Sequence, residues 1–313
     1  MKKIIYKYTS LVSHLLIHRK TKIGVKVLFL FLLLQCIELT HPQKTTAQVS
    51  VSFQFFYDAL SPHGSWINNA EYGYVWRPRV GLGFMPYDTN GYWTYTEAGW
   101  TWVSDYSWGW AAFHYGRWFN DPFYGWLWVP DNEWGPGWVT WRMSTDYYGW
   151  APIGPGISLQ FAYSNRYNVP DNHWRFVRDR DFGKRDLFRY YVDRSERRRV
   201  FNNSTVINNI REDRTQNSRY NPGPERSDVE RRVGRTFSPI TIKESDRPGQ
   251  RIEDNRFEIF RPRIQKNNPS EQRPIPSKVI NPRNEKQQVE RQQPSNKAQP
   301  NKQPGRPPRK NYD

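Results

Sequence analysis

The sequence predicts an all-β protein whose Trp/Gly-rich short strands repeat as a β-meander or a small stacked β-repeat, followed by a largely disordered basic tail. Three observations predict it. Fourteen of the 15 Trp residues lie between Trp66 and Trp150. Gly and Trp recur in that segment with a period of 26 residues. Beyond about residue 265 the chain consists mainly of Pro, Gln, Asn, Lys and Arg, a composition that cannot build a core.

The repeat has three full units, at residues 64–78, 91–109 and 116–135, and a partial fourth at 148–152. In each full unit a Gly-x-Trp segment precedes a second segment that begins with Gly and carries aromatic residues two apart. Residues two apart lie on one face of a strand, and Gly, Pro and Asp bound the segments as turns require. The unit is therefore predicted to be two short strands joined by a tight turn, too small to be stable alone.

The Trp rows have two interpretations, and the sequence leaves both open. Aromatic residues at strand spacing in a small repeat usually form the core. So many Trp residues in one short segment also allow an exposed aromatic face that stacks on sugar rings. The candidate stacking residues are Trp100, Trp118, Trp126 and Trp150, with nearby acids as hydrogen-bond acceptors for hydroxyl groups.

Five segments carry a resemblance to a known family: residues 56–66, 99–105, 108–110, 114–118 and 148–152. They resemble an uncharacterised family of secreted, Trp/Gly-rich bacterial proteins, a domain of unknown function. The resemblance covers about residues 53–152 and extends more weakly to about 242. The segment Tyr-Ser-Trp-Gly-Trp at 106–110 is also similar to the YXWGXW repeat of exported proteins, although Ala111 stands where the second spaced Trp belongs. The resemblance implies envelope location and a non-enzymatic character, and it transfers no active site.

The first 47 residues have the order of a secretory signal peptide. An apolar run at 27–34 follows three lysines and precedes Thr45-Thr46-Ala47, a small-x-small cleavage pattern. The run is shorter than a membrane-spanning helix, so we expect no transmembrane span after cleavage; a retained anchor and lipidation of Cys36 are the alternatives. Cys36 is the only cysteine, so the mature chain would lack disulfides and depend on packing for its stability.

The predicted organisation is a signal peptide at 1–47, a Trp-rich β-repeat domain at 48–180, a partly ordered connector at 181–265 and a disordered basic Pro/Gln/Asn-rich tail at 266–313. Alternating residues predict closing strands at 158–163 and 174–177. In the connector, Pro near the start and Gly just after the end predict a short helix near 224–233, with a strand following at 237–242.

Charge is divided unevenly along the chain. The net charge of +17 is composed of +7 in residues 1–47, −5 in residues 48–150 and +15 in residues 151–313. The basic tail is predicted to be a solvated end; the alternative is that it binds a charged partner, such as envelope glycans or anionic surface polymers. No specific nucleic-acid partner is indicated, and the sequence does not specify an oligomeric state.

No pattern of catalytic or metal-binding residues stands out. His63, His114 and His173 lack a second ligand at metal-binding spacing. Asp105 and Asp131 occupy equivalent repeat positions, which favours a role in the turn over one in glycoside cleavage. We therefore expect no enzyme, cofactor or metal site. The function that the sequence favours is an exported, non-enzymatic structural or interaction protein in the periplasm, at the outer surface or outside a Gram-negative-type envelope. The alternative is a carbohydrate-binding module that stacks exposed Trp on envelope glycans.

Overall fold

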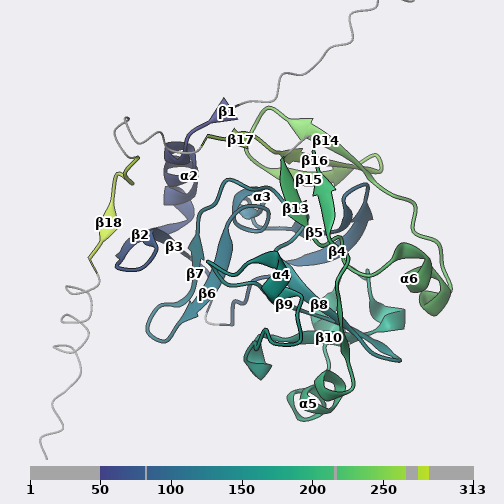
Figure 1. Cartoon of the computed structure of the whole chain (residues 1–313). Helices are drawn as coiled ribbons and strands as arrows, with labels where there is room; N and C mark the ends of the chain where they lie inside the picture. The colour runs from purple at the N-terminus through teal and green to yellow at the C-terminus, as the bar shows by residue number, and fades with distance from the viewer. Residues whose placement is uncertain (1–49, 82, 215–216, 266–273, 282–313) are drawn as a thin grey trace, which may run out of the picture. The chain divides into compact units, whose positions relative to one another are not determined.

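The computed structural model describes residues 50–265 and 274–281, apart from residues 82 and 215–216. Four β-hairpins follow one another in its first half (Figure 1). The first three coincide with the three full repeat units, and the partial fourth unit at 148–152 lies in the second strand of the fourth hairpin. In chain order they are β2 (Gly64–Asn69) with β3 (Gly73–Pro78), β4 (Gly91–Thr96) with β5 (Gly99–Ser104), β6 (Arg117–Asp121) with β7 (Gly125–Val129), and β8 (Val139–Met143) with β9 (Tyr147–Pro152). The predicted all-β fold and two-strand unit are both confirmed.

Two kinds of glycine explain why Gly recurs in register with Trp. The first kind makes the turn, since Gly73, Gly99 and Gly125 have φ values of 74°, 94° and 73°, a region in which a Cβ atom causes strain. The second kind begins the first strand and leaves room for a Trp of the second strand. A Cβ atom on Gly91 would lie 2.6 Å from the ring of Trp102, so any larger residue would displace that ring.

Each hairpin carries two Trp residues directly opposite one another. Opposite residues of an antiparallel pair lie on the same face of the sheet, so every hairpin has one aromatic face that must be buried against another segment. The four pairs are Trp66 with Trp76, Trp93 with Trp102, Trp118 with Trp128, and Trp141 with Trp150.

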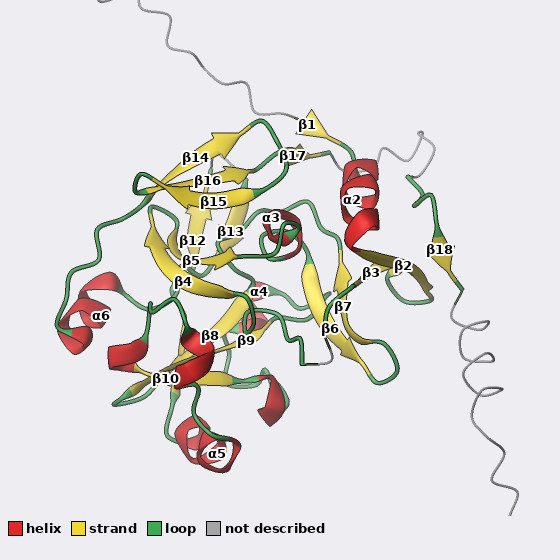
Figure 2. Ribbon diagram, turned by 180° about the vertical axis from the view of Figure 1, so that it is seen from behind, coloured by secondary structure: helices red, strands yellow, loops and turns green. Residues whose placement is uncertain are grey.

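Alternate hairpins associate with each other, the first with the third and the second with the fourth. The first and third join in one sheet of order β18-β2-β3-β7-β6, whose first strand is β18 (Val279–Ile280), and Trp76 lies opposite Trp128 where they meet. The second forms a two-stranded sheet of its own, and the fourth lies in a sheet of order β10-β9-β8-β11 with β10 (Arg175–Arg178) and β11 (Thr205–Ile207). Figure 2 shows the strands of these sheets in yellow.

The other elements are short helices and strands placed around the four hairpins (Figures 1 and 2). The helices are α2 (Phe53–Leu60), α3 (Gly109–Ala112), α4 (Leu159–Ala162), α5 (Arg194–Asn202) and α6 (Arg226–Val233), with 3-10 turns η1 (Ser61–His63), η2 (Asp171–His173), η3 (Asp179–Asp181) and η4 (Leu187–Tyr190). The strands are β1 (Ser50–Val51), β12 (Arg211–Asp213), β13 (Ser218–Tyr220), β14 (Thr241–Ser245), β15 (Gln250–Glu253), β16 (Arg256–Phe260) and β17 (Arg263–Ile264). Helix α6 confirms the helix predicted near 224–233, and Gly234 follows it with a φ of 73°.

The core consists mainly of tryptophan. Of the 15 Trp side chains, all are buried except Trp126, which is half-buried. Many of the buried indoles donate a hydrogen bond to a main-chain carbonyl, as Trp66 does to Tyr57 O at 3.1 Å and Trp76 to Leu60 O at 3.1 Å. A buried indole N–H usually needs such a partner. Of the two interpretations of the Trp rows, the structure therefore supports the core.

The predicted domain boundary near residue 180 does not divide this core. Phe182 and Phe237, both in the expected connector, lie with ring centroids 4.5 Å and 5.1 Å from that of Trp100. All described residues belong to one compact unit that spans Gln48–Asp313. The physical reason is that the aromatic faces of the hairpins need apolar partners, and later segments of the chain supply them.

Local predictions outside the repeat had mixed outcomes. The strand predicted at 174–177 is confirmed as β10, whereas the strand expected at 237–242 begins only at Thr241, as β14. The strand predicted at 158–163 is wrong, because Leu159–Ala162 forms helix α4. Ser158 caps this helix, since its Oγ accepts a hydrogen bond from Phe161 N at 3.3 Å, and such a cap favours a helical turn.

The predicted tail is only partly described. Residues 266–273 and 282–313 lie outside the described residues, as does the predicted signal peptide at 1–47. Residues 274–281 are described, and their strand β18 pairs in parallel with β2, with Ile280 opposite Ile67. The prediction of a disordered tail is therefore wrong for 274–281, because an aliphatic side chain there packs beside the outer face of the sheet.

Candidate functional site

The four Trp residues predicted to stack on a ligand do not form an exposed row. Trp100, Trp118 and Trp150 are buried, and their indole nitrogens donate to Pro224 O, Ala112 O and Tyr87 O at 3.1, 2.8 and 2.7 Å. Trp126 is half-buried, with its ring centroid 4.6 Å from that of His173. The stacking prediction is wrong for the three buried residues, because alternation along a strand shows which residues share a face and not what covers that face.

His114 is a fully buried titratable residue between the second and third repeat units. Its Nδ1 lies 2.9 Å from Gly135 O and its Nε2 lies 3.0 Å from Gln250 Oε1, while the imidazole stacks on Trp134 at 9° between planes. Burial lowers the pKa of His114 to about 4, so the side chain is neutral at pH 7. His114 thus acts as a packed, hydrogen-bonded core residue. Within the described ranges, no group of three or more His, Cys, Asp or Glu side chains is placed to hold a metal ion.

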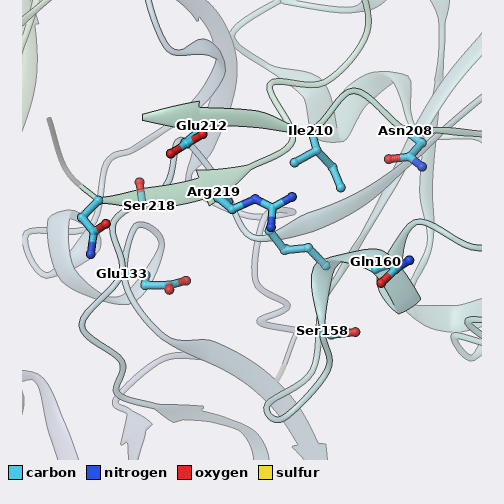
Figure 3. A pocket seen from close by; sticks show the side chains of 10 residues that line it. Glu133, Ser158, Gln160, Asn208, Ile210, Glu212, Ser218 and Arg219 are labelled. Atoms are coloured by element: carbon cyan, nitrogen blue, oxygen red, sulfur yellow. The ribbon is translucent and has the colours of Figure 1, made fainter. Parts of the chain in front are cut away.

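A polar cleft of about 780 Å³ lies beside the hairpin of β12 and β13 (Figure 3). Three parts of the chain form its walls: the loop that ends the third repeat, the start of α4, and the segment from residue 208 through β13. The lining side chains are Glu133, Ser158, Leu159, Gln160, Asn208, Ile210, Glu212, Asn217, Ser218 and Arg219.

The hairpin that forms the upper wall in Figure 3 is fixed to the Trp core at its base. Tyr220 is buried, and its ring packs edge-on against Trp134 with centroids 6.3 Å apart. Asn221 is also buried; its Nδ2 donates to Ile207 O at 2.7 Å, and its Oδ1 accepts from Gly223 N at 2.9 Å. These contacts place Ser218 and Arg219 at the cleft on a rigid support, which a binding site requires.

The cleft combines an unpaired cation with acids, amides and hydroxyls. Arg219 and Glu212 lie opposite one another in the hairpin, and both side chains are exposed. Within the described residues, neither side chain forms an ion pair. Figure 3 shows the Arg219 guanidinium directed over the cleft, with the Glu133 carboxylate on one side and Gln160 on the other. Ser218 is 2% exposed, and its Oγ has no partner among the described residues.

None of the residues that line this cleft is among the site residues predicted from the sequence. Glu133 follows the repeat position Asp131, whereas Arg219 and Glu212 lie in what was expected to be a connector. The local signal was weak: Arg211-Glu212-Asp213 and Ser218-Arg219-Tyr220 are two three-residue strands, and only their pairing across a turn makes them a hairpin. Strands of three polar residues cannot be recognised by apolar alternation.

Residues 57–157 match the model of a family of unknown function, DUF6600. The match runs from α2 to the residue before Ser158 and includes all four hairpins. It therefore contains one wall of the cleft, at Glu133, and ends before the other two. No curated protein and no solved structure matches the chain. These findings support an uncharacterised domain over the hairpins. None of the helices in the described part of the chain has the length and hydropathy needed to cross a bilayer.

Proposed function

We propose that this protein is an exported, non-enzymatic interaction protein of the cell envelope that binds its ligand in the polar cleft beside β12 and β13. The observation that carries the proposal is the unpaired Arg219 held over this cleft by a hairpin whose base is buried in the Trp core. Convergent polar groups held on a rigid scaffold fix the orientation of a ligand and provide specificity. The hairpin repeat supplies stability, and the later segments supply recognition.

The lining indicates the chemistry of the ligand. A guanidinium binds carboxylates in bidentate geometry, so Arg219 fits an acidic group. Glu133 and Glu212 accept hydrogen bonds from hydroxyl or amide donors, and Leu159 and Ile210 offer apolar contact to the C–H face of a sugar ring. A glycan that carries acidic or peptide substituents, as in a bacterial cell wall, has this combination of groups.

A titration of the purified full chain with soluble, peptide-substituted cell-wall glycan fragments tests the proposal. We expect Arg219→Ala to weaken binding by about tenfold or more, since losing a charge-assisted hydrogen bond costs about 1.5–3 kcal/mol. Arg256→Ala, an exposed arginine on β16, is the matched control and should bind normally. Equal binding by both variants, or no binding of any fragment by the wild type, would refute the cleft as the site.

Glycan stacking on Trp remains a second candidate only at Trp126. Its half-exposed ring lies on β7, and an exposed indole face is suited to a sugar. If Trp126→Ala abolishes binding while Arg219→Ala has no effect, this second function is the better one.

We also propose export from the cytoplasm, a location in the periplasm, at the outer surface or outside the cell, and a relationship to the YXWGXW-repeat exported proteins. The leader pattern at 1–47 supports export. Cell fractionation and N-terminal sequencing of the mature protein test it; we expect an N-terminus at Gln48, and a cytoplasmic full-length chain would contradict it. The basic tail remains a proposed contact for anionic envelope polymers.

A further inference from the structure

A second surface feature, independent of the cleft, lies on the chain between β10 and α5. We name residues 180–190 the aromatic–basic loop; it includes η4. Phe188 is 61% exposed and Tyr190 is 37% exposed, and Phe188 is the most exposed of the large hydrophobic residues in the described part of the chain. Single exposed aromatic residues are common on protein surfaces. The charges around these two distinguish the loop.

The loop carries four cations, and one lies beside each ring. Arg180, Lys184, Arg185 and Arg189 all lie in the loop. Lys184 Nζ lies 4.2 Å from the centroid of Tyr190, and the guanidinium of Arg189 lies 5.6 Å from the centroid of Phe188. Each aromatic residue thus has a cation beside it, at a distance that favours cation–π attraction.

The carboxylates of the loop balance these cations only partly. Asp181 is buried and binds Lys184 Nζ at 2.6 Å. Asp186 is exposed, and its Oδ2 lies 3.9 Å from Arg189 Nε, a distance at which a surface pair contributes little. Arg185 has no ion pair within the described residues, and its guanidinium lies 4.9 Å from the ring of Tyr92. The exposed side of the loop is therefore net basic.

The loop is held firmly from below. Leu187 and Phe182 are fully buried, and Phe182 packs on Trp100 and Trp150 of the core. Helix α6 packs against η3, and Arg235 donates a hydrogen bond to Gly183 O at 3.4 Å. With its inner residues fixed in this way, the loop presents Phe188 and Tyr190 outward at little entropic cost.

We propose that the aromatic–basic loop is a membrane-surface contact that binds anionic lipid headgroups. Phe188 would enter the boundary between headgroups and acyl chains, and Tyr190 would lie at the headgroup level. The exposed cations Arg180, Arg185 and Arg189 would face lipid phosphates. A soluble polyanion would satisfy the cations equally well. It would leave the exposed apolar ring of Phe188 in water, and for this reason the lipid surface is the better partner. The proposal goes beyond the cleft and does not depend on it.

Co-sedimentation of the purified full chain with vesicles tests the proposal. Vesicles of phosphatidylcholine alone are compared with vesicles that also contain phosphatidylglycerol. We expect binding to the anionic vesicles, and Phe188→Ser should weaken it about tenfold, the loss that corresponds to burial of a Phe side chain. Arg185→Gln and Arg189→Gln should each weaken it about fivefold.

Phe161→Ser is the matched control, because Phe161 is 43% exposed and lies on α4, outside the loop. The basic tail is identical in all variants, so a difference in vesicle binding between them arises from the substituted residue. Phe188 is exposed, so its variant should keep the near-ultraviolet circular dichroism of the wild type. Equal vesicle binding by Phe188→Ser and the wild type would overturn the proposal. Binding to heparin that is stronger than binding to vesicles and does not depend on Phe188 would also overturn the proposal, because it would show that the loop binds a soluble polyanion.

Discussion

Trp93 of β4 and Trp141 of β8 pack with their ring centroids 4.5 Å apart and their planes at 56°. Trp93 also lies 5.2 Å from Trp102, its partner across the hairpin, and 5.8 Å from Trp150. These four indoles join the second and fourth hairpins, which do not share a sheet. The contact between the two hairpins is therefore made by side chains and not by strand pairing, and its stability depends on the fit of the rings.

Replacing Trp141 with Ala should destabilise the protein severely. Trp141 is fully buried, and truncation of a buried Trp costs about 3–5 kcal/mol. Trp126→Ala, at the one half-buried Trp, should cost much less. Urea unfolding followed by far-ultraviolet circular dichroism measures both free energies of unfolding. Similar losses for the two variants would show that the indole cluster is not the main source of stability.

Trp141 and Trp150 lie opposite one another in the fourth hairpin and differ in their hydrogen bonding. Comparing their variants therefore distinguishes the contribution of a hydrogen bond from that of packing. Trp150 Nε1 donates to Tyr87 O at 2.7 Å, whereas Trp141 Nε1 has no partner among the described residues. Both side chains are fully buried, so Trp→Phe removes comparable apolar area at each. We expect Trp150→Phe to cost about 1–3 kcal/mol more than Trp141→Phe, because it leaves the Tyr87 carbonyl unsatisfied. The comparison of urea midpoints would contradict this if Trp141→Phe were the worse variant.

The repeat-equivalent turn glycines should respond differently to Ala. All three have positive φ, which strains an Ala by about 1–2 kcal/mol. At Gly73 and Gly125 a Cβ atom would meet nothing within 4 Å, whereas at Gly99 it would lie 2.3 Å from Pro222 Cβ. Gly99→Ala should therefore lower the melting temperature most. If the three variants melt together, the approach of the segment at Pro222 does not constrain this turn.

His114 should make the protein less stable as pH falls. Burial lowers its pKa to about 4 in the folded state, from 6.5. Above pH 6.5 both states are neutral at this residue and no stability is lost. Between pH 6.5 and 4 only the unfolded state binds the proton, so the free energy of unfolding decreases by roughly 1.4 kcal/mol per pH unit, about 3 kcal/mol in total, and then levels off.

Urea unfolding of the wild type and His114→Gln between pH 7.5 and 4 isolates this effect from that of the carboxylates. The stability advantage of the wild type over the variant should shrink as the pH falls. Parallel pH profiles for the two proteins would mean that His114 is protonated equally in the folded and unfolded states. His173→Gln is a suitable control, because burial also lowers the pKa of His173 but that side chain is only partly buried.

The repeat units could be predicted because their causes are local. A turn glycine such as Gly73 acts within its own hairpin, and the Trp spacing of each strand defines one aromatic face without reference to any other segment. The helix at Arg226–Val233 was predictable for the same reason, since Gly234 ends it directly. The capped turn at Ser158 was missed because an alternating pattern outweighed a single capping residue.

The candidate site could not be predicted, because its walls come from parts of the chain that no local pattern connects. Glu133 follows the third repeat, Gln160 belongs to α4, and Arg219 lies on a three-residue strand. Each residue by itself is typical of a solvated surface. The packing of Tyr220 against Trp134 helps to hold the hairpin beside the loop that carries Glu133.

Local residues are enough to predict the three full repeat units, the recurrence of glycine in register with tryptophan and the aromatic face of each unit. The tertiary structure alone decided that the first hairpin pairs with the third, that the second packs on the fourth, and that Trp100, Trp118 and Trp150 lie in the core. The physical reason is that strand alternation defines which side chains share a face. Whether that face meets solvent or protein depends on residues such as Phe182 and Phe237, which reach it from distant parts of the chain.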